Sequence, residues 1–172
     1  MNVIGSTALT GAAGEYLVMS RLLARGFIAA LAPQGVPNMD IVVTTVDGKT
    51  LCSIQVKTRW QKGADGGWHM GKKHEEIDER NIFYCFVDLG KSAGDNSTVY
   101  ILPSHIVAKV IKGSHANWLA LPGKNNRSHN DSNVRRLLPD YTKFFGKNTE
   151  FGLNWLEQYR ENWEILVPAT NP

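Results

Sequence analysis

Four polar residues stand in otherwise apolar segments of the sequence: Glu15, Asp40, Gln55 and Lys57. Carboxylate and amide oxygens are ligands that Mg²⁺ accepts in proteins. A lysine ammonium group supplies a positive charge beside them. If the fold brings these side chains together, carboxylate and amide oxygens and an ammonium group converge at one place, where a buried carboxylate needs a metal ion or a cationic partner. The elements that carry them must therefore place them at one site.

A predicted β-hairpin sets the spacing of three of these residues. Residues 40–46 and 50–58 are rich in β-branched side chains, and the Asp-Gly pair between them is typical of a two-residue turn. With that turn, or with a four-residue turn, residues whose numbers sum to 95 lie opposite each other, so Asp40 faces Gln55. Lys57 shares the face of Gln55. A three-residue turn would break this pairing.

A predicted helix over residues 7–25 carries Glu15. Its apolar residues recur at three- and four-residue steps, and Gly26 follows where helices commonly end. The predicted apolar face consists of Leu9, Ala12, Tyr16, Met19 and Leu23. Glu15 lies at its edge, where a partly buried carboxylate needs a cation. That cation could be a metal ion, or it could be Lys57 in a structural ion pair.

The order of the remaining elements predicts an α/β domain with a mixed sheet. We expect strands at residues 27–31, 82–87 and 98–102, a helix from Ser104 to about Ile111 and a last helix over about 150–163. The last helix carries aromatic residues four positions apart, from Phe151 to Trp163, which indicates a stripe that faces the core. Residues 61–80, with at most a short helix, and residues 121–148 are predicted to be loops.

Glu15 in the first helix, Asp40 opening the second strand and Gln55-Val56-Lys57 in the third resemble the PD-(D/E)xK nuclease superfamily. That group includes restriction endonucleases, Holliday junction resolvases and some homing endonucleases. The resemblance covers roughly residues 8–102 and is strengthened by the segments Gly11-Ala12-Ala13-Gly14-Glu15 and Pro37-Asn38-Met39-Asp40. The chain departs from the pattern twice. Its proline lies three residues before the aspartate, and glutamine stands where the family usually has Asp or Glu.

The resemblance implies a restriction-endonuclease-like α/β core, with a mixed central β-sheet flanked by helices. One domain would span residues 1–172, with its core at about 8–120 and a basic loop and C-terminal helix over 121–165. The resemblance further implies a metal-dependent endonuclease that acts on DNA. Its Mg²⁺ or Mn²⁺ would be held by Asp40, Gln55 and Glu15, while Lys57 would orient the attacking water. Because Gln55 is neutral, a catalytically inactive nucleic-acid-binding protein on the same fold is the alternative.

The net charge of +3 is unevenly distributed along the chain. Residues 109–147 carry eight Lys or Arg but only two acidic residues, whereas residues 1–108 are balanced. Such a block fits a phosphate backbone, although a solvated basic loop has the same composition. The predicted nucleic-acid contacts are Arg59, Lys72, Lys73, Arg127, Arg135 and Arg136. Pairing of Arg135 and Arg136 with Asp131 or Asp140 is the structural alternative.

Several function classes are excluded by composition. No apolar run approaches the ~18 residues of a membrane span, and the N-terminus lacks the features of a signal peptide. The two cysteines form no CxxC pair, so we expect neither a disulfide scaffold nor a Cys-rich zinc site. These features predict a cytoplasmic protein without a membrane partner. A homodimer would be consistent with cutting both strands of a duplex.

Overall fold

The computed structural model describes residues 7–33, 35–61 and 66–167. Its centre is a five-stranded sheet in the order β1-β2-β3-β5-β6. The strands are β1 (Ile28–Leu31), β2 (Ile41–Thr44), β3 (Thr50–Arg59), β5 (Ile82–Asp88) and β6 (Thr98–Pro103). Strands β3 and β5 pair in parallel, while the other neighbours are antiparallel. The predicted α/β fold with a mixed sheet flanked by helices is confirmed.

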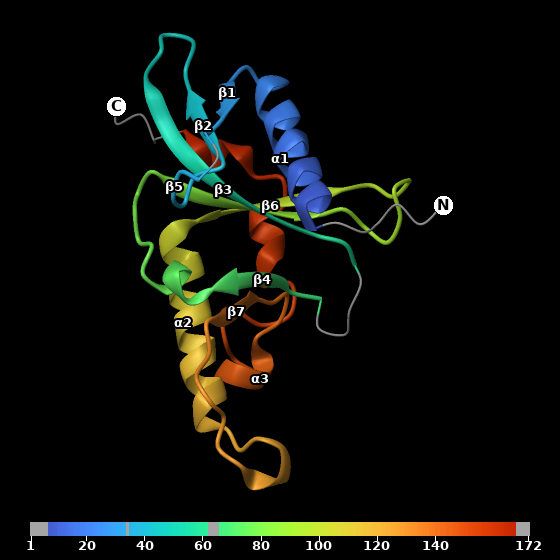
Figure 1. Ribbon diagram of the computed structural model, residues 1–172, viewed down its shortest axis with the longest axis vertical. Helices are drawn as coiled ribbons and strands as arrows, with labels where there is room; N and C mark the ends of the chain where they lie inside the picture. Colours follow the sequence, from blue (N-terminus) through green and yellow to red (C-terminus); the bar gives the residue numbers. More distant parts are fainter. Residues whose placement is uncertain (1–6, 34, 62–65, 168–172) are drawn as a thin grey trace.

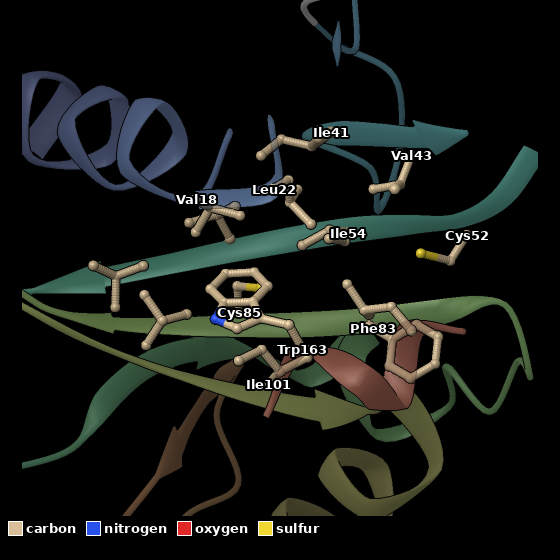
Figure 2. Close-up of a cluster of buried hydrophobic side chains, with 14 of the residues drawn as sticks. Val18, Leu22, Ile41, Val43, Cys52, Ile54, Phe83, Cys85, Ile101 and Trp163 are labelled. Carbon is tan, nitrogen blue, oxygen red and sulfur yellow. The ribbon is translucent and has the colours of Figure 1, made fainter. Parts of the chain in front are cut away.

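Two layers cover the faces of this sheet (Figure 1). Helix α1 (Thr7–Leu23) lies on one face, where Val18 and Leu22 point toward Ile41 and Ile54 (Figure 2). The other face is covered by α2 (Ser104–Ala120) and by a small sheet of β4 (Trp68–Gly71) and β7 (Val134–Leu137). The short strands β4 and β7 lie in segments predicted to be loops, so that prediction is wrong there. No helix in the described part is long and apolar enough to cross a bilayer.

Short helices complete the chain. They are η1 (Lys72–Glu75), η2 (Lys124–Asn126), α3 (Thr142–Phe145), η3 (Trp155–Tyr159) and η4 (Trp163–Leu166), where η denotes a 3₁₀-helix. The predicted helix over 150–163 is therefore wrong. Asn154 and Glu161 have left-handed backbone angles, with φ of 68° and 51°, which an α-helix cannot contain. The predicted core role of the stripe is confirmed for Phe151, Trp155 and Trp163, which are buried.

The β2–β3 hairpin reaches the predicted register by a different route. Thr44 pairs with Thr50, and the turn between Thr45 and Lys49 contains three residues, so the two-residue turn is wrong. A bulge follows, because β3 holds one extra residue, Leu51. Beyond it Val43 pairs with Cys52 and the predicted sum of 95 is restored. The bulge thus cancels the shift that the three-residue turn introduces.

Helix α1 meets the sheet through a different face from the predicted one. Leu9, Tyr16 and Leu23 are 62%, 58% and 51% exposed, whereas Gly14, Val18 and Leu22 are buried. A Cβ atom at Gly14 would overlap Oγ1 of Thr58 on β3. The absence of a side chain at this position lets the helix backbone approach the strand closely. That contact, and not the width of the apolar stripe, sets the rotation of the helix and the position of Glu15.

Candidate active site

Asp40 is fixed at the point where β2 begins, beyond which β3 has no hairpin partner and pairs only with β5. Its backbone N–H donates to the Ile54 carbonyl at 2.9 Å, which extends the hairpin by one step. Its carboxylate oxygen Oδ2 accepts the backbone N–H of Val56 at 2.7 Å and the side-chain amide of Gln55. The Asp40 carboxylate therefore accepts the Val56 N–H in place of a carbonyl group from a neighbouring strand. Oδ1 receives no hydrogen bond from the residues that the structure describes.

Glu15 approaches Asp40 from α1 without a cationic partner. Burial raises the pKa of the Glu15 carboxyl, and the nearby negative charge of Asp40 raises it further. Among residues 7–33, 35–61 and 66–167, no cation forms an ion pair with Glu15. The structural Glu15–Lys57 pair considered above is thus not formed. Two carboxylates that repel each other and form no ion pair with the described cations make a site suited to a metal ion.

Lys57 lies two residues after Gln55, with its side chain on the same face of β3. Burial lowers the pKa of the Lys57 ammonium group, the charge of Asp40 raises it, and the charge of Lys73 lowers it. The Lys57 ammonium group is therefore close to the Asp40 carboxylate and to the Lys73 ammonium group. Since Lys73 belongs to η1, this 3₁₀-helix lies near Lys57. The structure brings all four residues of the predicted constellation together.

Two further residues lie beside the site, His74 and Tyr84, and neither is among the catalytic or metal-binding residues predicted from the sequence. Tyr84 is the partner of Gln55 in the parallel β3–β5 pairing. Its hydroxyl group shares a 2.7 Å hydrogen bond with Nδ1 of His74 on η1. His74 is 2% exposed and Tyr84 is fully buried. Burial and the charge of Asp40 raise the pKa of Tyr84, whereas burial and the charges of Lys57 and Lys73 lower that of His74 to about 4.

This environment makes stability depend on the protonation of His74. Its folded pKa of about 4 lies below the ordinary value of 6.5, so between these pH values the unfolded chain binds a proton that the folded protein does not. Stability should fall as pH drops from 6.5 to 4, by about 2 kcal/mol from this residue. His74→Gln retains a hydrogen-bond partner for Tyr84 but cannot titrate. We expect urea unfolding to show a weaker pH dependence in this variant, and equal dependence would contradict the assignment.

The donor set fits a hard divalent cation with few protein ligands. In the described part of the chain, no three His, Cys, Asp or Glu side chains are grouped as a metal site. Mg²⁺ commonly binds through one or two carboxylates and keeps several waters. Asp40 and Glu15 supply that number of carboxylates, and Gln55 supplies an amide group beside them. The amide nitrogen of Gln55 donates to Asp40, so the amide must turn before its oxygen can face an ion.

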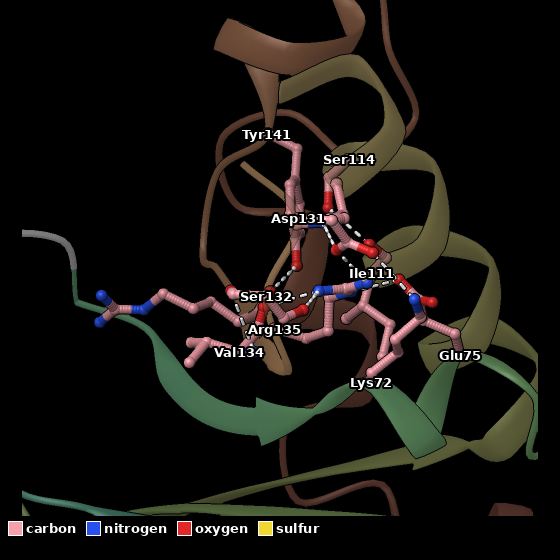
Figure 3. Close-up of polar contacts among 11 residues, drawn as sticks. Lys72, Glu75, Ile111, Ser114, Asp131, Ser132, Val134, Arg135 and Tyr141 are labelled. Atoms are coloured by element: carbon pink, nitrogen blue, oxygen red, sulfur yellow. Dashed lines mark hydrogen bonds and ion pairs between the residues drawn. The ribbon is translucent and has the colours of Figure 1, made fainter. Parts of the chain in front are cut away.

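The predicted nucleic-acid contacts fall into two groups. Arg135 is 3% exposed and its guanidinium is paired with Glu75 and Asp131 (Figure 3), which is the structural alternative stated above. Arg59 pairs with Asp88 at 2.7 Å and stacks on the Trp68 ring. The guanidinium groups of both are thus engaged within the protein. The other four predicted nucleic-acid contacts lie nearer the surface. Of these, Lys72, Lys73 and Arg127 are exposed and Arg136 is half-buried.

Removing Arg135 should damage the fold. Arg135→Ala leaves the Glu75 carboxylate buried and unpaired, which costs about 3–5 kcal/mol. Arg127→Ala is the matched control, and at its exposed position the cost should stay within about 0.5 kcal/mol. Chemical denaturation measures both. A small loss for Arg135→Ala would return this residue to the set of candidate nucleic-acid contacts.

No protein-family model and no curated protein matches this chain. A solved structure does: a bacterial homing endonuclease, I-Ssp6803I, with a TM-score of 0.53 and 15% sequence identity. The superposition covers 94% of this chain and 93% of that one. The chain therefore shares the fold of that endonuclease. At 15% identity the likeness establishes the fold alone.

Proposed function

We propose that the chain is a metal-dependent endonuclease of the PD-(D/E)xK type that hydrolyses phosphodiester bonds in DNA. The observation that carries the proposal is the pair of carboxylates, Glu15 and Asp40, which lie near Lys57 but form no ion pair with it or with any other cation that the structure describes. The fold shared with a homing endonuclease supports it, and the β2–β3 hairpin presents Asp40 to Glu15 of α1.

Each residue of the site has a role in this proposal. Asp40, Glu15 and the side-chain oxygen of Gln55 would hold Mg²⁺ or Mn²⁺. When bound, such an ion activates water and neutralises charge on the phosphate. Lys57 would orient the attacking water and stabilise the negative charge that develops on the phosphate. Lys73, exposed on η1, adds a second positive charge near Lys57.

The ligand role of Gln55 can be tested by metal binding. Gln55→Glu adds negative charge and should keep or tighten the affinity for Mg²⁺. Gln55→Ala removes a ligand oxygen and should weaken affinity by about tenfold or more, an effect common when a group that supports a metal site is lost. Isothermal titration calorimetry of the three proteins makes the comparison. Equal affinities would remove Gln55 from the ligand set.

A nucleic-acid-binding protein without catalysis is the second candidate. The Gln55 amide favours it, since its nitrogen donates to Oδ2 of Asp40, where a bound ion would instead require an oxygen ligand from Gln55. Incubation of supercoiled plasmid with Mg²⁺, Mn²⁺ or EDTA separates the two. An endonuclease nicks the plasmid only with metal, and Lys57→Ala binds DNA without nicking it. Binding of DNA by the wild-type protein without nicking would establish the second candidate, and a failure to bind would overturn both.

A further inference from the structure

The loop between α2 and β7, residues 121–133, projects from the body of the molecule beyond the end of α2 (Figure 1). We propose that this projection, called the finger below, enters a groove of the bound DNA and recognises base edges there. The inference rests on the proposed function for its partner. It adds a recognition element that lies outside the site of Glu15, Asp40, Gln55 and Lys57.

The tip of the finger presents the side chains suited to this task. Asn125, Asn126, Arg127 and Ser128 are all exposed. Asparagine amides pair with adenine edges and arginine with guanine edges in the major groove. Asn125 and Asn126 both have left-handed backbone angles, with φ of 57° and 58°, so the tip is a tight turn. Arg127 forms no ion pair with any residue that the structure describes.

The charge of the finger favours a polyanion. Residues 121–130 contain no carboxylate. The first carboxylate that follows, Asp131, is paired at the root with the cations Lys72, at 2.8 Å, and Arg135, at 3.3 Å, and it contacts His115 at 2.8 Å. These contacts hold the pKa of Asp131 well below its usual range. The positive charge of Arg127 is therefore left uncompensated at the tip.

The root of the finger is built to hold the tip in place. Asp131 ties it to η1 through Lys72 and to α2 through His115. The ring of His129 stacks on Trp118 of α2, with 3.9 Å between ring centroids. An anchored loop loses less conformational entropy on binding than a free one, so its contacts contribute more to affinity. A merely solvated loop would need none of these anchors.

The finger and the candidate active site are linked through one short helix. Lys72 of η1 binds the root of the finger. The next two residues of η1, Lys73 and His74, lie close to Lys57. A duplex that occupies the active site and passes Lys73 is therefore led toward the finger. The two regions would contact different parts of the same DNA molecule.

Selection from a random duplex library, without metal so that no cleavage occurs, tests the proposal. The wild-type protein should enrich a sequence motif. The variant Asn125→Gly/Asn126→Gly/Arg127→Lys keeps the left-handed backbone and the positive charge but loses the recognising groups. It should lose about tenfold or more of the discrimination at one or more positions of the motif. The affinity of this variant for DNA should depend on salt almost as that of the wild type does, because the positive charge is retained.

The matched control is Lys91→Gln/Asn96→Gly, which alters a cation and an amide on a different exposed loop. It should enrich the wild-type motif. The proposal is overturned if the finger variant selects the same motif as the wild type, or if the wild type selects none. Plasmid nicking with Mg²⁺ by the wild type tests the nuclease proposal separately. If the wild type selects a motif through the finger but never nicks the plasmid, the finger proposal stands and the nuclease proposal is refuted.

Discussion

Asp40→Asn and Lys57→Ala should each lower the rate of DNA cleavage by at least about 10²-fold while the protein remains folded. The Asn side chain retains an oxygen that can accept the hydrogen bonds from Val56 and Gln55, but it lacks the charge that holds a cation. Lys57 forms no ion pair within the described residues, so its removal should leave the fold largely undisturbed.

The matched controls lie at the far end of the same hairpin. Asp47→Asn and Lys49→Ala change the same residue types, and both residues are exposed beside the turn. Cleavage of a labelled duplex under single-turnover conditions should show wild-type rates for both controls. Circular dichroism and melting temperature confirm that each variant is folded. Cleavage within a few fold of the wild type by either active-site variant would refute the nuclease mechanism.

Gly14→Ala should destabilise the protein by about 3 kcal/mol or more, although alanine is the better helix former. The added Cβ overlaps Oγ1 of Thr58, and the Cβ of Thr58 would lie only 2.9 Å away. Helix α1 must then move away from β3. Since the next residue is Glu15, the movement also separates the two carboxylates of the site.

Gly11 in the same helix provides the comparison. A Cβ atom there meets nothing within 4 Å, so Gly11→Ala should stabilise the protein by about 0.5–1 kcal/mol. Urea unfolding of both variants measures the opposite signs. Adding Thr58→Ala to Gly14→Ala removes the overlapping hydroxyl group and should recover part of the loss. Equal stability of Gly14→Ala and the wild type would show that the helix does not approach the strand this closely.

The hairpin could be predicted because its signals are local. Alternating residues in two adjacent strands place Ile41 opposite Ile54 and Asp40 beside Gln55, and each strand lies within a few residues of the turn. The prediction of a two-residue turn is wrong, because Asp-Gly also fits a three-residue turn with Gly48 at φ 81°. The register survived only because Leu51 forms a bulge, which no local pattern indicated.

Other features depend on contacts between distant segments. Strands β4 and β7 are four residues each and pair across a long stretch of chain, so neither has the length that makes a strand visible in sequence. The rotation of α1 depends on Gly14 against Thr58, while its strongest apolar pattern lies on the exposed side. His74 became part of the site because η1 folds over Tyr84, a residue that the sequence marks only as part of a buried strand.

The bulge at Leu51 separates the hairpin into two parts with different tolerance to change in length. Deleting Leu51 alone would turn the outer half into a regular ladder, and Val43 would still pair with Cys52. The outer half ends in exposed residues, with Val46 81% exposed. Exposed loop tips accept insertions most readily. The turn over residues 46–48 is therefore the place to attach a fluorophore or a peptide tag without shifting Asp40 against Gln55.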